Sequence, residues 1–389
     1  MAFQFPASPT VGQIFTPIAG VSYKWDGQGW VPYSADLPAP LVGMNRIING
    51  DFRFDQIKEG GTYTTAGSGI FGPDQWFFTD GGGAGHFSVK READPDYAGE
   101  YNALITVTTV DSTMGVTDNY NIQTSIEGWN FADFLSGSAG AQQLTLSFEV
   151  KCSITGTFAI TFKNNANNRS YVSTFTVNAA NTVERKIITL TCDTSGTWET
   201  GNLVGVTVGI SLGHGSNFYA PSANTWSAGS YWALSTTTNL ISTAGATMRL
   251  KRFKVEKGAI ATPFERRQYS QELALCQRYY FKTFDSGVAV AQNVGGSTGE
   301  WRFALFGGGV GLFTSIPYKV SMRTQPTITT YNPSAANAQV RNASTGTDCT
   351  LTAPNGASAD HATIFCNSDA GAVGGQAGLI HITADARLT

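Results

Sequence analysis

Charged residues are scarce in this sequence. Lys, Arg, Asp and Glu together make up 14% of the 389 residues, against roughly 25% in an average soluble protein. The formal net charge is −3, and the basic clusters at 249–254 and 266–267 are short. Binding of nucleic acid needs a concentrated positive field that displaces counterions. We therefore expect no nucleic-acid partner.

Cysteine is rare, and its spacing is wide. The five cysteines are Cys152, Cys192, Cys276, Cys349 and Cys366. No two of them form a CxxC pair, so the sequence indicates neither a zinc ribbon nor a redox motif. We expect buried, reduced thiols. Cys349 and Cys366 could pair instead, because both lie in the same C-terminal β region.

Long apolar runs are also missing. No segment approaches the roughly 18 consecutive apolar residues of a membrane-spanning helix. The N-terminal stretch MAFQFPASPTVGQIF has neither a charged start nor an apolar run, so it does not resemble a signal peptide. These absences predict a chain made in a cytoplasm without insertion into a membrane. A role outside the cell would then require another route, such as release in a particle.

The sequence lacks the common catalytic motifs. It contains no HExxH, GxSxG or phosphate-binding loop, and no GxGxxG followed by a suitably placed acid. Glycosidases need two carboxyl groups across a cleft. The acids nearest to aromatic residues are Asp74, Glu127, Asp133 and Glu149. Solvation of loops and capping of turns explain such acids better. We predict a non-enzymatic protein with no catalytic residue, metal or cofactor.

Glycine, aromatic and small polar residues are abundant. There are 44 glycines, aromatics reach 12%, and 41% of the residues are hydrophobic. The hydrophobic content is enough to build cores. Many aromatics and glycines with little charge are typical of β-sandwiches or barrels with long loops. A chain of this length is expected to form two or three domains.

Residues 1–45 read as a small separate unit. Val21, Tyr23 and Trp25 alternate, Asp26-Gly27 indicates a turn, and Trp30 restarts the pattern. This spacing predicts a β-hairpin. The unit is too small for a core of its own, so we expect it to dock on another protein. Residues 34–42 read as a semi-rigid proline linker.

Residues 46–265 alternate strand patterns with loops and predict one large antiparallel sandwich. The expected strands cover 47–52, 75–78, 103–110, 144–150, 157–162, 171–177, 184–191, 203–212 and 248–256. In the last of these, Met248, Leu250, Phe253 and Val255 give a slightly broken alternation.

Residues 266–284 predict the one clear helix, with Ser270 as its N-cap. Tyr269, Leu273, Cys276 and Tyr280 recur at steps of four, three and four. This spacing fits a helix that packs on its own sandwich, and it equally fits a contact between subunits on a symmetry axis. Residues 285–389 return to strand patterns at 301–306, 316–320, 327–331, 363–366 and 379–383, which predict a second, smaller β-sandwich.

Aromatic residues collect in Gly-, Ser- and Asn-rich loops. Flat rings stack on the C–H faces of sugars, and short polar side chains then bind the hydroxyls. The segment 213–232 is the richest example, being long, polar and aromatic as binding loops often are. The candidate glycan-binding residues are Trp129, Tyr219, Trp226, Tyr231 and Trp232. The same rings could instead fill the sandwich edge or a contact between subunits.

Several stretches resemble one known family. They are 45–56 (NRIINGDFRFDQ) with 72–78 (GPDQWFF), 250–265 (LKRFKVEKGAIATPFE) with 272–280 (ELALCQRYY), and 318–333 with 380–388. Together they resemble the carbohydrate-binding-module-like jelly roll and C-terminal β domain of tailed-phage and prophage fibre proteins. Residues 11–15 and 25–30 are similar to the attachment segments of those proteins.

The resemblance implies a structural virion protein, usually a homotrimer, attached to other virion proteins by its N-terminus. On this chain it assigns attachment to Phe15, Trp25 and Trp30. Some jelly rolls of this kind hold a structural calcium near the opening strand; Asn49, Asp51 and Glu256 could supply oxygens, although a solvated turn accounts for them as well.

The sequence therefore predicts an all-β fibre protein. It should comprise an N-terminal attachment segment and linker (1–45), a jelly-roll domain (46–265), a connecting helix (266–284) and a C-terminal β-sandwich (285–389). The expected function is host-surface glycan binding from a phage particle. Two alternatives stay open: a purely structural head fibre, decoration or collar protein, and a glycan depolymerase.

Overall fold

The computed structural model describes residues 5–18, 21–25, 27–33, 44–65 and 69–388. The chain divides into two compact units, 1–44 and 45–389. The linker predicted at 34–42 lies entirely outside the described residues. Within the described residues, no helix is long and apolar enough to cross a membrane.

The N-terminal unit is a three-stranded antiparallel sheet. Its strands are β1 (Ile14–Ile18), β2 (Val21–Trp25) and β3 (Trp30–Tyr33). Trp25 pairs with Trp30 across β2 and β3, so the predicted hairpin is confirmed. The ring of Phe5 stacks on Trp30 at 5.6 Å and lies 5.5 Å from the ring of Phe15. A cluster of aromatic rings therefore takes the place of a larger core.

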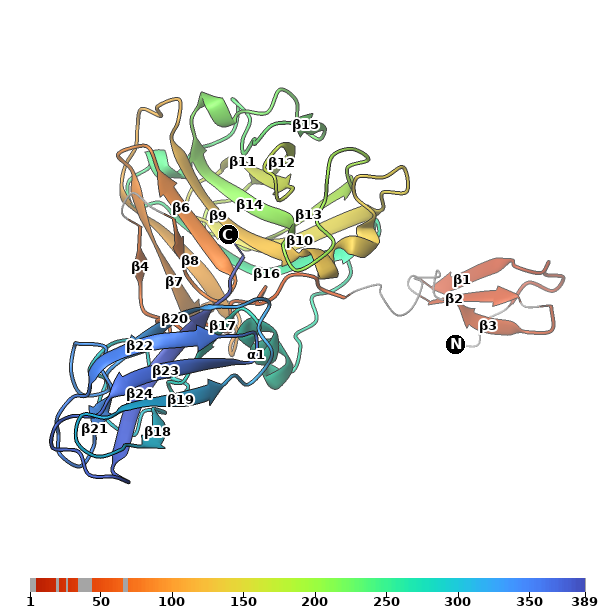
Figure 1. Cartoon of the computed structure of the whole chain (residues 1–389). Helices are drawn as coiled ribbons and strands as arrows, with labels where there is room; N and C mark the ends of the chain where they lie inside the picture. The colour runs from red at the N-terminus through yellow and green to blue at the C-terminus, as the bar shows by residue number, and fades with distance from the viewer. Residues whose placement is uncertain (1–4, 19–20, 26, 34–43, 66–68, 389) are drawn as a thin grey trace. The chain divides into compact units, whose positions relative to one another are not determined.

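The second unit contains a large antiparallel sandwich (Figure 1). One sheet has the order β13 (Glu184–Thr191), β10 (Gln143–Cys152), β16 (Thr247–Lys257), β8 (Tyr101–Thr109), β7 (His86–Ala93) and β4 (Tyr63–Thr64). The other has the order β15 (Trp226–Ala228), β12 (Arg169–Val177), β11 (Gly156–Lys163), β14 (Val204–His214), β9 (Asn119–Glu127), β6 (Trp76–Gly81) and β5 (Ile70–Phe71). The prediction of an all-β, sandwich-forming chain is confirmed.

The alternation of side chains builds the core between the two sheets. In β10, Leu144, Leu146, Phe148 and Val150 are buried in one hydrophobic cluster. Successive side chains of a strand point to opposite faces, so these four residues meet the inward residues of the facing sheet. Burial of each such side chain stabilises the folded protein by about 1.5–3 kcal/mol relative to leaving that side chain exposed.

The broken alternation in the last strand of the sandwich marks a β-bulge. The register between β10 and β16 shifts at this point, and Arg252 has a φ of +53°. The extra residue lets both Leu250 and Phe253 face the core. Gly50 lies against the bulge, where a Cβ would come within 2.2 Å of the Phe253 carbonyl oxygen. Only glycine fits this approach.

The opening stretch is a turn and not the strand predicted at 47–52. Asn49 and Phe52 have φ values of +55° and +52°, which a strand does not allow. The Asn49 amide side chain donates to the carbonyls of Phe54 (2.8 Å) and Asp74 (2.9 Å), and its Oδ1 accepts from the Phe54 N–H at 2.9 Å. These bonds compensate for the unusual backbone conformation.

The same asparagine joins stretches that are distant in the sequence. Its carbonyl accepts from Trp76 Nε1 at 3.1 Å, and its backbone N–H donates to Glu272 Oε1 at 2.5 Å. Gln56 donates through Nε2 to Asp74 Oδ2 (2.7 Å) and to the Tyr280 carbonyl (3.0 Å). The segments 45–56, 72–78 and 272–280 therefore form one buried polar network.

The helix is shorter than predicted. Helix α1 covers Tyr269–Gln277 and begins after Gln268, so Ser270 lies inside its first turn and is not the N-cap. The predicted helix end at 284 is wrong as well, because Tyr280–Lys282 form strand β17. The run Tyr-Tyr-Phe favours strand, and pairing with β24 (Ala377–Asp385) satisfies its backbone groups.

The C-terminal β region follows the helix and packs beside the sandwich (Figure 1). One sheet centres on β24, which pairs with β17, β18 (Trp301–Ala304), β20 (Thr327–Tyr331) and β21 (Arg341–Asn342). The other has the order β19 (Gly311–Pro317), β23 (His361–Asn367) and β22 (Thr350–Ala357). Both sheets contribute residues to one hydrophobic core, including Leu312, Ile364 and Ile382. All five cysteines of the chain are buried and free.

A buried carboxylate connects the sandwich to this region. Glu127, at the end of β9, accepts two bonds from the guanidinium of Arg278, at 3.0 and 2.6 Å, and one from the Tyr279 hydroxyl at 2.6 Å. Only 2% of Glu127 and 1% of Tyr279 is exposed. A bidentate Arg–carboxylate pair fixes both position and angle, so this contact sets how the two parts meet.

Candidate functional site

A groove lies on the outer face of the seven-stranded sheet, with a volume of about 330 Å³. Strands β6, β9, β11 and β14 form its floor, and the segments 164–167 and 218–232 form its walls. Its lining side chains are Thr79, Asn119, Asn121, Gln123, Lys163, Asn164, Asn165, Asn167, Val204, Thr207, Phe218, Ser230 and Trp232. The lining is thus rich in amides and hydroxyls, and Lys163 is the one charged residue among these.

The floor follows from strand alternation. In β9, Tyr120 and Ile122 point into the sandwich core, so Asn119, Asn121 and Gln123 point to the opposite face. The Asn121 amide donates to Asn119 Oδ1 at 2.7 Å. Asn121 Oδ1 is buried and has no hydrogen-bond partner. Such an orphaned acceptor is costly unless water or a ligand satisfies it.

The aromatic segment 213–232 folds back over the sheet. Ala159 and Val172 on the outer face of the sheet form a small buried cluster with Ala233, and Tyr219 and Tyr231 pack against it. Trp232 is only 4% exposed. A Cβ on Gly209 would lie 2.5 Å from the Trp232 ring. Glycine at this position of β14 therefore lets the indole approach the strand closely.

Lys163 and His214 flank the Trp232 ring. The His214 imidazole stacks on the indole with ring centres 5.6 Å apart and planes inclined by 9°. Lys163 Nζ lies 4.0 Å from the centre of the indole and donates to Ser230 Oγ at 3.2 Å. Burial lowers the pKa of Lys163 to about 7. Burial, assisted by Lys163, lowers the pKa of His214 to about 3.

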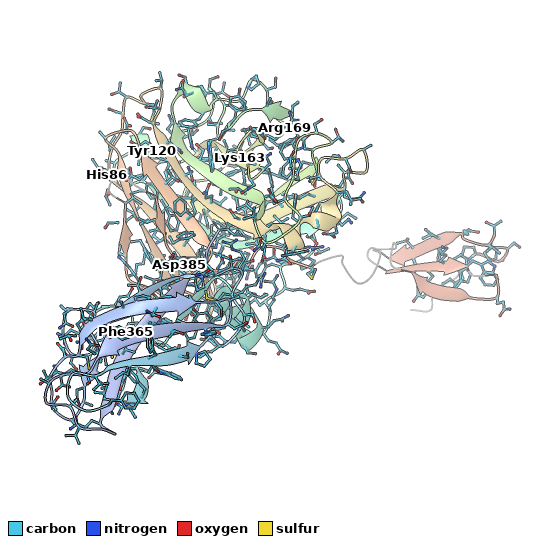
Figure 2. The ribbon with its side chains drawn as sticks, in the orientation of Figure 1. His86, Tyr120, Lys163, Arg169, Phe365 and Asp385 are labelled. Carbon is cyan, nitrogen blue, oxygen red and sulfur yellow. The ribbon has the colours of Figure 1, made fainter. Side chains whose placement is uncertain are left out.

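The pKa values of Lys163 and His214 determine the charge of the groove near neutral pH. Burial disfavours the charged form of a base, so His214 is neutral, with one bond between its Nδ1 and Ser211 Oγ at 2.6 Å. Its Nε2 has no hydrogen-bond partner. Lys163 titrates in the physiological range. Figure 2 shows Lys163 on the sheet that carries the groove.

The five aromatic residues predicted to bind glycan do not form one group. Trp232 lines the groove, whereas Tyr219 and Tyr231 pack in the small outer cluster. Trp226 packs on the sandwich core, and its Nε1 donates to the Thr191 carbonyl at 2.9 Å. Trp129 lies in a short 3₁₀ helix, 66% exposed, outside the residues that line the groove.

Sequence reasoning missed the residues of β9. Asn119, Asn121 and Gln123 were not among the candidates, because no strand was predicted at 119–127. The signal was present: these three polar residues alternate with Tyr120 and Ile122, and this period of two is typical of a half-buried strand.

The attachment and contact residues lie elsewhere in the chain. Trp25, Trp30 and Phe15 contribute to the aromatic cluster of the N-terminal unit. In and after α1, Tyr269 is 55% exposed and its ring lies 4.8 Å from that of Phe54, and Leu273 is half-buried. Cys276 and Tyr280 are buried within this chain. The four residues predicted for a subunit contact therefore differ widely in accessibility.

The four acids nearest to aromatics each contact a donor of the chain itself. Asp74 accepts from Gln56, and burial raises the Asp74 pKa to about 6. The other three form ion pairs: Glu127 with Arg278, Asp133 with Arg46, and Glu149 with Arg252.

The possible calcium-binding residues are also engaged by protein groups. Asp51 accepts from Arg53 at 2.6 Å, and Glu256 accepts from the Thr262 hydroxyl at 2.6 Å. The Asn49 side chain is held within the opening turn. In the described part of the chain, no group of three or more His, Cys, Asp or Glu is arranged to hold a metal ion.

Comparisons with known proteins give structural likenesses only. No known family matches the sequence, and no curated protein matches it. The tailspike protein 4 enzymatically active domain of bacteriophage CBA120 is 11% identical, with a TM-score of 0.28; the match covers 55% of this chain and 21% of the tailspike chain. This chain thus spans about a fifth of that protein.

Two carbohydrate-binding modules are similar to the same extent. The family 11 module of the cellulase Lic26A-Cel5E of Clostridium thermocellum is 12% identical, with a TM-score of 0.26, over 56% of this chain and 97% of the module. TmCBM61, solved with β-1,4-galactotriose, is 9% identical, with a TM-score of 0.27; the match covers 55% of this chain and 99% of the module. Likenesses with TM-scores this low carry no argument about function.

Proposed function

We propose that the groove on the seven-stranded sheet binds a glycan. The single observation that carries this proposal is its lining, in which side-chain amides and hydroxyls from adjacent strands stand beside an aromatic wall. An amide offers both donors and acceptors, and a hydroxyl offers both in one atom. A sugar presents the same mixture of groups around an apolar ring face. Phe218, which is partly exposed, supplies apolar surface at the wall, and the buried Trp232 ring supports the wall from behind.

Binding is favoured over hydrolysis at this groove. Glycoside hydrolysis requires an acid and a second carboxylate on either side of the scissile bond. Among the residues that line the groove there is no Asp or Glu. A depolymerase would therefore need a second site, and we place the glycan-binding proposal ahead of that alternative.

The groove can be tested with a double substitution of Gln123 and Asn165 to Ala. Each lost neutral hydrogen bond costs about 0.5–1.5 kcal/mol, so the two together should cost about 1–3 kcal/mol, a loss of affinity between about fivefold and a hundredfold. The wild-type chain and the variant would be compared on a glycan array and by calorimetry. Gln143→Ala, an exposed residue of the other sheet, is the matched control and should bind normally.

Retention of every bound glycan by the Gln123/Asn165 variant would place binding outside this groove. Trp129→Ala would then be the next variant, since Trp129 is the most exposed of the aromatic candidates. Absence of binding to any glycan by the wild-type chain would reject the proposal.

We further propose that the chain is a fibre subunit of a phage particle, attached by its N-terminal unit and assembled as a homotrimer. The separate N-terminal sheet and its aromatic cluster support attachment. An exposed apolar patch on the β19–β23–β22 sheet supports self-association. Phe313 is 61% exposed, and its ring lies 5.1 Å from that of Phe365. Figure 2 labels Phe365 in the C-terminal β region.

Sedimentation equilibrium of the full chain tests the trimer. We expect a trimer at micromolar concentration, and we expect Phe313→Ser to weaken it, because the substitution removes apolar area from the patch. Ile260→Ser, which changes an exposed residue of a loop, should leave the assembly unchanged. A stable wild-type monomer would contradict the proposed trimer. That result would not affect the proposal that a single chain binds a glycan.

A further inference from the structure

Lys163 differs from the other buried lysines of this chain. Among the described residues, four lysines are buried: Lys163, Lys251, Lys254 and Lys282. Lys251 pairs with Asp94 at 2.6 Å, Lys254 with Glu256 at 3.4 Å, and Lys282 with Glu59 at 2.6 Å. Lys163 is 5% exposed and forms no ion pair with any described residue. Buried charges are normally paired, so this exception needs an explanation.

The contacts that Lys163 does make leave its charge uncompensated. Its Nζ donates to the Ser230 hydroxyl and faces the Trp232 indole. A hydroxyl and an aromatic face each stabilise an ammonium, but neither carries a formal negative charge. The ammonium has three donor hydrogens, and its side chain lines the groove. A ligand in the groove is therefore the remaining source of a counterion.

We infer that the groove selects an acidic glycan, one that carries a carboxylate, and that Lys163 binds this carboxylate. The inference rests on the proposed glycan-binding function and names the class of glycan. The amides of β9 and of the segment 164–167 would bind the hydroxyls, as they would for any sugar. Lys163 supplies discrimination, because a neutral sugar leaves the buried ammonium without a counterion.

The selectivity should depend on pH. Around Lys163, β6 presents Thr79, β9 presents Asn119, Asn121 and Gln123, the wall presents Ser230 and Trp232, and β14 presents Thr207 and, against Trp232, His214. His214 is the titratable group among these, and its pKa near 3 keeps it neutral above pH 5. The pKa of Lys163 in the free protein is about 7.

The direction of the pH effect follows from these values. A carboxylate binds the ammonium form, so binding raises the pKa of Lys163 and takes up protons. Below pH 7 the free protein already carries the ammonium, and affinity is at its maximum. Above pH 7 the proton must be acquired on binding, so affinity falls by up to tenfold for each pH unit.

The test measures the affinity for polyuronate, hyaluronan and sialylated oligosaccharides, and the affinity for the same oligosaccharides after their carboxyl groups have been reduced. We expect the full wild-type chain to prefer the acidic forms by at least tenfold at pH 6, and to lose up to about thirtyfold in affinity between pH 6 and 8.5, because pH 8.5 lies 1.5 units above the pKa of Lys163. Lys163→Met should abolish the preference. Lys163→Arg should keep the preference at pH 8.5, because a guanidinium stays protonated.

Lys151→Met is the matched control, because Lys151 is paired with Asp96 on the other sheet. It should retain the preference and its pH dependence. Equal binding of acidic and reduced glycans, or binding of neutral glycans alone, would overturn the acidic selectivity and leave the proposed glycan-binding function standing. No binding of any acidic, reduced or neutral glycan would overturn both. A preference that Lys163→Met retains would assign the selectivity to another residue.

Discussion

Replacement of Glu127 by Ala should lower the free energy of unfolding by about 3 kcal/mol, near the lower end of the range for a broken buried ion pair. The substitution leaves the Tyr279 hydroxyl without its acceptor and Arg278 without its bidentate partner. Tyr279 is almost fully buried, so water cannot replace the lost carboxylate there. Arg278 is partly exposed, which is why we expect the lower value.

Urea unfolding of the full chain measures this effect. Glu127→Gln should lose less stability than Glu127→Ala, because its amide oxygen can still accept one bond. Glu265→Ala is the control, since Glu265 is exposed and surface substitutions usually change stability by no more than about 0.5 kcal/mol. A Glu127→Ala protein as stable as that control would show that the ion pair does not hold the C-terminal β region to the sandwich.

Replacement of Lys163 by Met should stabilise the free protein below pH 7. The folded-state pKa of Lys163 is about 7, whereas an unfolded lysine titrates near 10.4. Below pH 7 the folded wild-type protein must keep a buried, unpaired ammonium. We expect Lys163→Met to be more stable there by on the order of 3 kcal/mol. The indole of Trp232 offsets part of the burial penalty through its attraction for the ammonium.

The stability advantage of Lys163→Met over the wild-type protein should decrease as pH rises from 7 to 10. In this window the unfolded wild-type chain binds a proton that the folded protein does not bind, so wild-type stability increases with pH. Unfolding free energies at pH 6, 8 and 10 test the sign, and Lys151→Met serves as the control. A Lys163→Met variant that is less stable than wild type at pH 6, or a difference that does not change with pH, would contradict a buried, unpaired lysine.

Much of the fold could be predicted because it depends on local patterns. The alternation of Leu144, Leu146 and Phe148 identified β10, and the irregular spacing before Phe253 marked the bulge in β16. The helix end was mispredicted because Tyr280 fits a helical period as well as a strand. Pairing with β24, about a hundred residues further along the chain, decided between them. Local periodicity contains no information about such a partner.

The candidate site was harder to predict than the fold. Trp232 was found because an aromatic residue in a polar loop suggests binding, but Trp226 satisfies the same rule and packs on the core. The difference arises because the segment between them folds back on the sheet. Lys163 carries no signal of its own in the sequence. It stands out only when the structure shows that it is buried and that no acid of the described chain lies beside it.

By itself, the sequence determined the class of structure: antiparallel sheets, a separate N-terminal hairpin, one helix near 270, and a surface with little charge. Composition and periodicity dictate these features through side-chain burial and strand alternation, which act over a few residues. Only the tertiary structure decided which outward residues share a groove and which lysine lacks a counterion. Both depend on strand order, because the sheet places β6, β9, β11 and β14 side by side although they are distant in the sequence. The groups that become neighbours in space then set the electrostatic energy of each charged side chain.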